Sequence, residues 1–132
     1  MRKLTTSFCL ILSLFLFSAT SAWSADYWKG WDAYNNGDYA TALREWGPLA
    51  KQGLASAQTL LGEMYANGVG VPQDYSTAHK WFSLAAEQGF APAQFNLGLM
   101  YANGEGVIQD NLYAHMWWNI AASQGNENAT NN

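Results

Sequence analysis

Cysteine is almost absent from the 132-residue sequence, since the single one is Cys9, near the N-terminus. Charged residues are scarce as well, at 12% of the chain. No apolar run reaches the roughly 20 residues that a membrane-spanning helix needs. A disulfide-stabilised fold and a stably inserted membrane protein are therefore not expected. Because hydrophobic residues make up 49% of the chain, packing alone can build a core.

The first 25 residues show the three parts of a secretory signal peptide. A basic start precedes an almost unbroken apolar run over residues 10–17, and small residues follow at 18–22. Signal-peptide cleavage favours small residues at the first and third positions before the cleaved bond, which places the cleavage site within residues 22–25. We therefore expect a periplasmic or secreted protein whose mature form has lost its only cysteine.

Basic residues are few once this leader is removed. Four Lys and Arg then face ten Asp and Glu, which gives a formal charge of −6. Nucleic acids and anionic lipid surfaces bind basic patches. We therefore expect neither of them as a partner.

A repeat of 36 residues organises the remaining chain. Residues 55–90 and 91–126 align without a gap and are identical at 21 of 36 positions. A weaker copy with a shorter loop occupies 27–54, with helices expected near 27–35 and 38–52. About three stacked repeats are the usual minimum for burying the face that one helix pair leaves exposed. The sequence predicts an all-α solenoid of about three helix pairs.

Each full copy predicts two helices. The first spans 55–67 and again 91–103, because apolar residues recur there at helical spacing and an Asn-Gly pair then supplies a left-handed cap. Asp74 and Asp110 are placed to cap the second helix of each copy. The other carboxylates, such as Glu63, show no sequence reason to be buried.

Large and small residues alternate along the second helix of each copy. Trp81 and Trp117 lie at equivalent positions among alanines. Such a combination lets two helix backbones approach while the ring fills the gap. We expect both rings to be buried in the core.

The pattern A-x-A-Q-x-x-L-G-x-M-Y-A-N-G-x-G-V-x-Q-D, followed by A-H-x-W and A-A-x-Q-G, resembles the Sel-1-like repeat. This family is related to the tetratricopeptide repeat but has a longer loop between its helices. The resemblance is strong over 55–126 and moderate over 27–54. It implies a right-handed α/α solenoid that serves as an adaptor or scaffold, and many bacterial members are exported. It supplies no substrate and no catalytic residues.

The resemblance also has a departure. Similar proteins often continue into another helix that covers the last repeat. We expect that cap to be missing here and residues 127–132 to form a disordered tail.

Motifs of catalysis and cofactor binding are missing. The sequence has no G-x-S-x-G, no H-E-x-x-H and no phosphate-binding loop, and it lacks the S-x-x-K of penicillin-binding enzymes. His79 and His115 occupy the same position in successive repeats. Packed helices lie roughly 10 Å apart, whereas zinc ligands lie about 2 Å from their metal. We expect no catalytic residue, no cofactor and no metal.

Positions that differ between the two copies are free to be exposed and to serve function. On the first helix they form a stripe opposite the core face, which we expect to line the concave side and to bind a peptide or a partner protein. Alternatively, the next helix covers them. This binding stripe consists of Thr59, Leu60, Glu63, Phe95, Asn96 and Leu99.

The last helix is more apolar than a terminal helix should be, because the outer face of a terminal repeat meets water. Polar Ser76 and Lys80 are replaced by Leu112 and Met116 one repeat later. We expect a contact surface there, and a symmetric dimer is its simplest closed arrangement. The residues of this expected interface are Leu112, Tyr113, Met116 and Trp118.

These features favour an exported protein–protein interaction module rather than an enzyme. Two alternatives stay open. One is a small cell-wall-associated hydrolase or penicillin-binding-like enzyme, which no motif supports. The other is a truncated fragment of a longer repeat protein.

Overall fold

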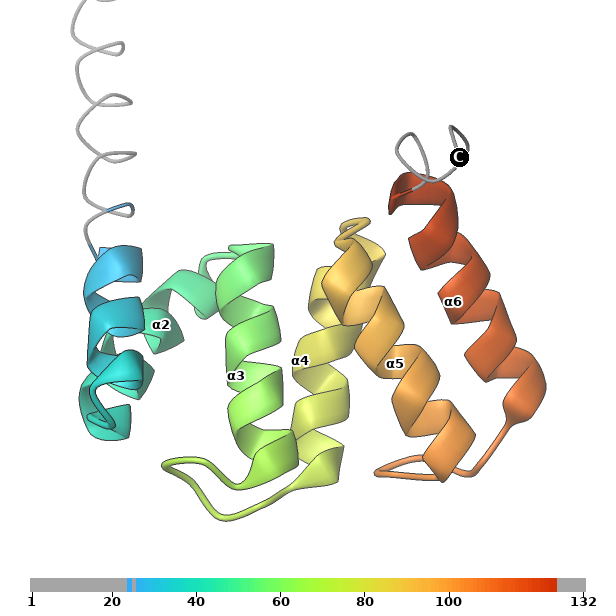
Figure 1. Cartoon of the computed structure of the whole chain (residues 1–132), viewed down its shortest axis with the longest axis horizontal. Coiled ribbons are helices and arrows are strands. Elements are labelled where there is room, and N and C mark those ends of the chain that lie inside the picture. The colour runs from blue at the N-terminus through green and yellow to red at the C-terminus, as the bar shows by residue number, and fades with distance from the viewer. Residues whose placement is uncertain (1–23, 25, 126–132) are drawn as a thin grey trace, which may run out of the picture.

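The computed structural model describes residue 24 and residues 26–125, and every regular element within them is a helix. The helices stand side by side in one antiparallel row (Figure 1). A first helix at residues 26–35 is followed by α2 (Tyr39–Lys51), α3 (Ala55–Asn67), α4 (Tyr75–Glu87), α5 (Ala91–Asn103) and α6 (Asn111–Gly125). The predicted all-α solenoid of three helix pairs is confirmed. Apart from Ser24, the predicted signal peptide lies outside the described residues, as does the predicted tail at 127–132.

Glycine ends the first helix of each full repeat at the predicted residue. Gly68 and Gly104 have φ values of +64° and +70°, and their amides donate to the carbonyl oxygens of Met64 and Met100. Glycine adopts this left-handed conformation without the steric cost that a Cβ brings. The bounds of α3 and α5 therefore match the prediction.

Aspartate begins the second helix of each pair. The carboxylates of Asp38 and Asp74 each accept a hydrogen bond of 3.1 Å from the backbone amide three residues later. Asp110 accepts from the amides of Leu112 and Tyr113, at 2.9 and 3.1 Å. Free amides at a helix start are satisfied in this way, so the predicted caps are confirmed.

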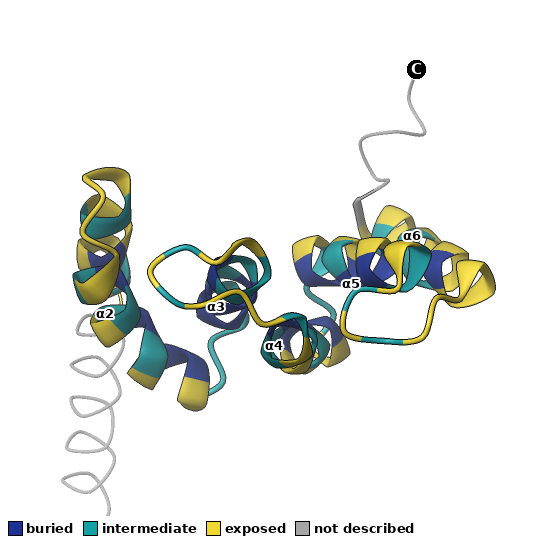
Figure 2. Cartoon of the chain, turned by 90° about the horizontal axis from the view of Figure 1, so that it is seen from below, coloured by how far each residue is buried: buried dark blue, intermediate teal, exposed yellow. Residues whose placement is uncertain are grey.

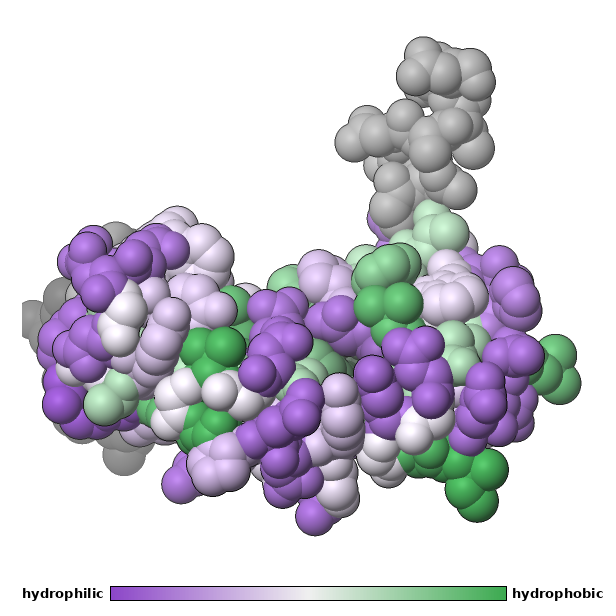
Figure 3. Space-filling view, turned by 60° about the horizontal axis from the view of Figure 1, so that its bottom comes forward, coloured by the Kyte–Doolittle hydropathy of each residue, from purple (hydrophilic) through white to green (hydrophobic). Residues whose placement is uncertain are grey.

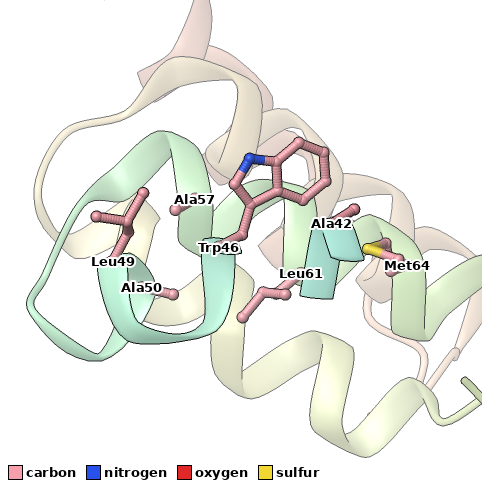
Figure 4. Packing of buried hydrophobic residues seen from close by; sticks show 7 residues of the cluster. All are labelled: Ala42, Trp46, Leu49, Ala50, Ala57, Leu61 and Met64. Atoms are coloured by element: carbon pink, nitrogen blue, oxygen red, sulfur yellow. The ribbon is translucent and has the colours of Figure 1, made fainter. Parts of the chain in front are cut away.

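The core repeats with the sequence. One buried cluster, shown in Figure 4, consists of Ala42, Trp46, Leu49, Ala50, Ala57, Leu61 and Met64. A second cluster consists of Ala78, Phe82, Ala85, Ala86, Ala93, Leu97 and Met100. Each member of the second cluster lies 36 residues after a member of the first. Figure 2 shows these buried segments on the helix sides that face a neighbour.

A ring that packs on a glycine joins the two helices of each pair. The rings of Trp46, Phe82 and Trp118 lie against Gly30, Gly62 and Gly98. A Cβ placed on Gly62 would lie 2.6 Å from the Phe82 ring. Both indoles also donate to a carbonyl of the facing helix, Trp46 to Tyr27 at 3.1 Å and Trp118 to Phe95 at 3.2 Å. The glycines therefore permit the close approach within each pair.

The prediction that Trp81 and Trp117 are buried is only partly confirmed, since both rings pack against a core cluster but remain half-buried. The fully packed ring is one residue further along, at Phe82, which is 2% exposed. Adjacent helical positions differ by about 100° around the axis. Position 82 therefore faces the neighbouring first helices, whereas position 81 lies toward the edge of the core.

A glutamine side chain forms a hydrogen bond across the junction between one helix pair and the next. The side-chain amides of Gln58 and Gln94 donate to the carbonyl oxygens of Ala50 and Ala86, at 3.0 and 3.1 Å. Ala57 and its equivalent Ala93 are fully buried at the same junctions. The A-x-A-Q signature is therefore the stacking element of the fold.

Candidate binding surfaces

The binding stripe predicted on α3 and α5 is only partly open. Thr59 is buried, and its hydroxyl donates to the carbonyl oxygen of Ala55 at 2.9 Å, so its expected exposure is wrong. Leu60, Glu63 and Asn96 are half-buried. Phe95 and Leu99 are the exposed members, at 52% and 37%. The α3 part of the stripe lies beside the following helix pair, whereas no described element covers Phe95 and Leu99.

A first hollow of about 250 Å³ adjoins the N-terminal part of the stripe. Its lining comes from the first helix, α3 and the start of α5: Tyr27, Trp31, Ser56, Thr59, Leu60, Glu63, Phe90 and Pro92. Aromatic rings and one carboxylate dominate it.

A second hollow of about 180 Å³ continues from Glu63 between α3 and α5. Phe82 lies among its lining residues, and Glu105 adds a second carboxylate from the following loop. The lining residues are Glu63, Ala66, Asn67, Tyr75, Phe82, Asn96, Leu99, Met100 and Glu105. Because Glu63 lines both hollows, the two are neighbours along the stripe, and we call them together the trough.

Glu63 is the carboxylate with an unusual environment in this trough. Its Oε1 accepts a hydrogen bond of 3.3 Å from the side-chain amide of Asn96. Burial raises the pKa of the Glu63 carboxyl above its ordinary value, and the Asn96 hydrogen bond offsets part of that rise. Across residues 26–125, no Lys or Arg forms an ion pair with it. The expectation that it has no reason to be buried is wrong, because α5 packs over it.

Glu45 is a second carboxylate with little exposure, and it has a structural role. Its side chain is 12% exposed and forms ion pairs with Lys29 at 2.8 Å and Arg44 at 3.4 Å. The hydrogen bond from Lys29 lowers the pKa of Glu45. The pair joins the first helix to α2.

A third hollow, of about 260 Å³, lies on another side of α3 and was missed by the sequence analysis. It is lined by Leu43, Gly47, Lys51, Leu61, Tyr65, Val71 and Trp81. A Cβ on Gly47 would meet nothing within 4 Å, whereas the equivalent position one repeat later is Ser83. Glycine in place of a larger residue at position 47 was the sequence feature that could have indicated this hollow. Because Trp81 lines the hollow, its ring stays half-buried.

The predicted C-terminal interface divides into two surfaces. Leu112, Tyr113 and Met116 are exposed at 80%, 46% and 38%, and neighbouring Ile108 is exposed at 91%. We call these four residues the ridge. Trp118 is half-buried on another side of α6, where it packs on Gly98, so its grouping with the ridge is wrong. Figure 3 shows apolar surface in separate patches with polar residues between them.

The two histidines lie in different environments. The Nε2 atom of His79 is buried without a hydrogen-bond partner, its ring meets Tyr101 edge-on at 5.8 Å, and burial lowers its pKa. His115 is exposed and meets Trp118 edge-on at 5.5 Å. Among the described residues, no three His, Cys, Asp or Glu side chains gather closely enough to hold a metal. No helix in that part of the chain is long and apolar enough to cross a membrane.

Comparison with protein families identifies the repeat. The Sel1 repeat model matches residues 55–90 and 91–126. The chain belongs to the Sel1 repeat family. Both matched Sel1 repeats coincide with the two full copies of the 36-residue period.

Solved structures of Sel1 proteins have the same fold. A protective antigen present in uropathogenic Escherichia coli strains, displaying an SLR fold, aligns over 83% of this chain with a TM-score of 0.74 and 39% identity. A Sel1 repeat protein from Oxalobacter formigenes aligns over 78% with a TM-score of 0.72 and 37% identity. The chain spans 24% and 42% of the lengths of those structures. Among curated proteins, no match was found.

Family membership defines the general class of function. Sel1 repeats commonly serve as protein-interaction modules and are typically non-enzymatic. In this chain, the trough, the third hollow and the ridge are the surfaces where such an interaction can take place.

Proposed function

We propose that the chain is an exported protein-interaction module whose trough binds an extended segment of a partner protein. The single observation that carries this proposal is the position of Glu63, which lines both hollows and so places them next to each other along the binding stripe. Neighbouring hollows suit an extended chain, because successive side chains can enter successive hollows.

The chemistry of the trough indicates what such a segment presents. Trp31 in the first hollow and Leu99 in the second are apolar contacts, both more than a third exposed. Buried aromatic and apolar anchors carry most of the energy of protein interfaces. Glu63 and Glu105 add acceptors for the partner's amides or basic groups. We expect a partner segment with apolar anchors and net positive charge.

Export is supported by the leader pattern and by one relative. The relative is the protein described as a protective antigen of uropathogenic Escherichia coli strains, to which this chain is 39% identical. The acidic mature surface also suits basic protein segments better than nucleic acid.

Site-specific photocrosslinking in the exporting bacterium tests this function. A photoreactive residue at Leu60 or Leu99 should trap a protein partner, because both side chains line the trough. Leu84 on α4 is a matched control, since it is 47% exposed and lines neither hollow. Adducts at Leu84 but not at Leu60 or Leu99 would disprove the assignment of the trough.

We propose self-association through the ridge as a second, separate function. Its supporting observation is charge: α6 contains no Asp, Glu, Lys or Arg, although the mature chain is acidic. Two α6 helices can therefore pack against each other with Asp110, the cap at the start of α6, as the one carboxylate within the span of each ridge. Sedimentation should show a dimer that Leu112→Lys/Met116→Lys converts to monomer, and a monomeric wild-type chain would refute it.

A further inference from the structure

The C-terminal end of the helix row repeats a surface that is sealed one repeat earlier. This end face consists of Phe95, His115, Trp118 and Ala122. Each of these residues lies 36 positions after a member of the set Thr59, His79, Phe82 and Ala86. The comparison of the two sets therefore shows what the end face lacks.

Burial differs sharply between the two sets. Thr59, Phe82 and Ala86 are 4%, 2% and 3% exposed. At the end face, by contrast, Phe95 is 52% exposed and Ala122 is also exposed. Thr59, Phe82 and Ala86 are buried because α5 packs against α4 in one core cluster. No described element occupies the corresponding place beside α6.

The end face is nevertheless an organised surface. The rings of Phe95 and Trp118 lie 6.4 Å apart, and the Trp118 indole donates to the Phe95 carbonyl oxygen at 3.2 Å. His115 packs edge-on against the same indole at 5.5 Å. An aromatic surface without Asp, Glu, Lys or Arg is therefore held in place and faces outward.

The two junctions inside the chain, α2 with α3 and α4 with α5, indicate which kind of helix packs on such a surface. In both, the covering helix starts with A-x-A-Q and contributes a buried leucine four residues after the second alanine: Leu61 in α3 and Leu97 in α5. The glutamine donates to an alanine carbonyl of the preceding helix, which is Ala50 or Ala86. The carbonyl at the same place on the end face belongs to Ala122.

The N-terminal end of a second copy of this chain is poorly suited to cover the end face. The first helix carries exposed Asp26, Lys29 and Asp32 beside exposed Trp28, and Lys29 pairs with Glu45. A second copy stacked head to tail would place these charges against an apolar surface, and desolvating them costs free energy. A helix from a different protein is favoured over this chain's own N-terminal end.

We infer that the end face docks a helix of another protein that carries the pattern Ala-x-Ala-Gln-x-x-Leu, the chemistry of the first helix of a Sel1 repeat. The small alanine allows close approach to Ala122, the glutamine donates to its carbonyl oxygen, and the leucine packs against Trp118. This surface shares Phe95 with the binding stripe, but none of its residues lines either hollow, so the inference does not depend on the trough.

A synthetic peptide with the sequence of residues 55–90, used under conditions in which circular dichroism shows it to be helical, tests the inference. It is added to the ¹⁵N-labelled mature chain, and the indole N–H signal of Trp118, assigned through Trp118→Phe, is followed by NMR. We expect that signal and the Ala122 amide signal to shift in a saturable way. A peptide with Ala57→Lys should bind at least about tenfold more weakly, as expected when a charge is placed in a close-packed contact.

Protein variants separate this surface from the ridge. Ala122→Arg, or His115→Glu should the first variant fold poorly by circular dichroism, should weaken binding of the peptide by a similar factor. Leu112→Lys lies on the ridge and should leave binding unchanged.

The inference is overturned if the Trp118 signal does not shift when the peptide is added, or if Leu112→Lys weakens binding as much as Ala122→Arg does. It is also overturned if Ala122→Arg dissociates a dimer of the free chain, or if removal of residues 126–132 is required before the peptide binds. None of these results bears on the trough, which is tested separately by crosslinking at Leu60.

Discussion

At the scale of single residues, the absence of a side chain decides how closely two helices approach. Gly62 allows the Phe82 ring to lie against the backbone of α3, and Gly98 does the same for Trp118. Large rings opposite glycine fill the space between helices at the density of a protein interior. A single methyl group at either glycine must therefore displace the ring.

Gly62→Ala tests this contact. We expect it to lower the free energy of unfolding by about 1–3 kcal/mol, the usual range for overpacking a core, as measured by urea denaturation. In a Phe82→Leu background the added methyl meets a smaller side chain, so the same change should cost much less. An equal cost in both backgrounds would show that the ring is not the obstacle.

Glu63 gives a prediction about pH. Because burial raises its pKa in the folded state, the folded protein disfavours the ionised form. The resulting penalty is absent below the ordinary Glu pKa of 4.5, grows as pH rises, and is complete above the raised folded pKa. Glu63→Gln, which keeps an acceptor for Asn96, should therefore raise thermal stability at pH 7 and give little gain near pH 4. A gain that is larger at pH 4 than at pH 7 would contradict this account.

At the scale of elements, local signals were sufficient for helix bounds but not for burial. The Asn-Gly and aspartate caps act within a few residues of the helix end, so they fixed α3 and α5 and the starts of α4 and α6. The exposure of Thr59 and Phe95 depends instead on whether a later helix packs over them. The two residues occupy the same repeat position, and nothing local distinguishes them. The third hollow was likewise missed, because its shape depends on the distance between α2 and α4.

The glutamine at each junction is the element-scale feature most open to test. Gln94→Leu preserves volume but removes the hydrogen bond to the Ala86 carbonyl oxygen. We expect a loss of about 1–2 kcal/mol in the free energy of unfolding, in line with the loss of a buried hydrogen bond. Gln58→Leu should cost more at the preceding junction, because Gln58 Oε1 also accepts a hydrogen bond of 2.9 Å from the Gln88 side chain, whereas Gln94 Oε1 is buried without a partner. Unchanged urea midpoints in both variants would show that the A-x-A-Q glutamine does not stabilise stacking.

At the scale of the whole molecule, the two ends of the row differ in chemistry. The N-terminal end is charged and held by the Lys29–Glu45 ion pair, whereas α6 lacks Asp, Glu, Lys and Arg. The repeat period predicted the architecture because each core cluster uses the same seven positions. The division of the expected C-terminal interface into a ridge and a separate Trp118 surface required the three-dimensional arrangement of α6.

The leader makes a prediction at this scale as well. We expect the mature protein to begin between Trp23 and Asp26, after removal of the signal peptide. Intact mass and N-terminal sequencing of periplasmic material check this directly. Soluble cytosolic protein that still begins at Met1 would contradict export.

The central claim is that the binding stripe contacts the partner. The most direct measurement is the affinity of the crosslinked partner for Phe95→Ala and Leu99→Ala compared with Leu84→Ala. All three side chains are exposed and apolar, so each change should leave folding nearly intact. We predict that the two stripe variants bind about tenfold or more weakly, as for apolar anchors, while Leu84→Ala binds like the wild type. Wild-type affinity in Leu99→Ala would contradict the claim whatever Phe95→Ala shows, because Leu99 lines the trough whereas Phe95 also belongs to the end face.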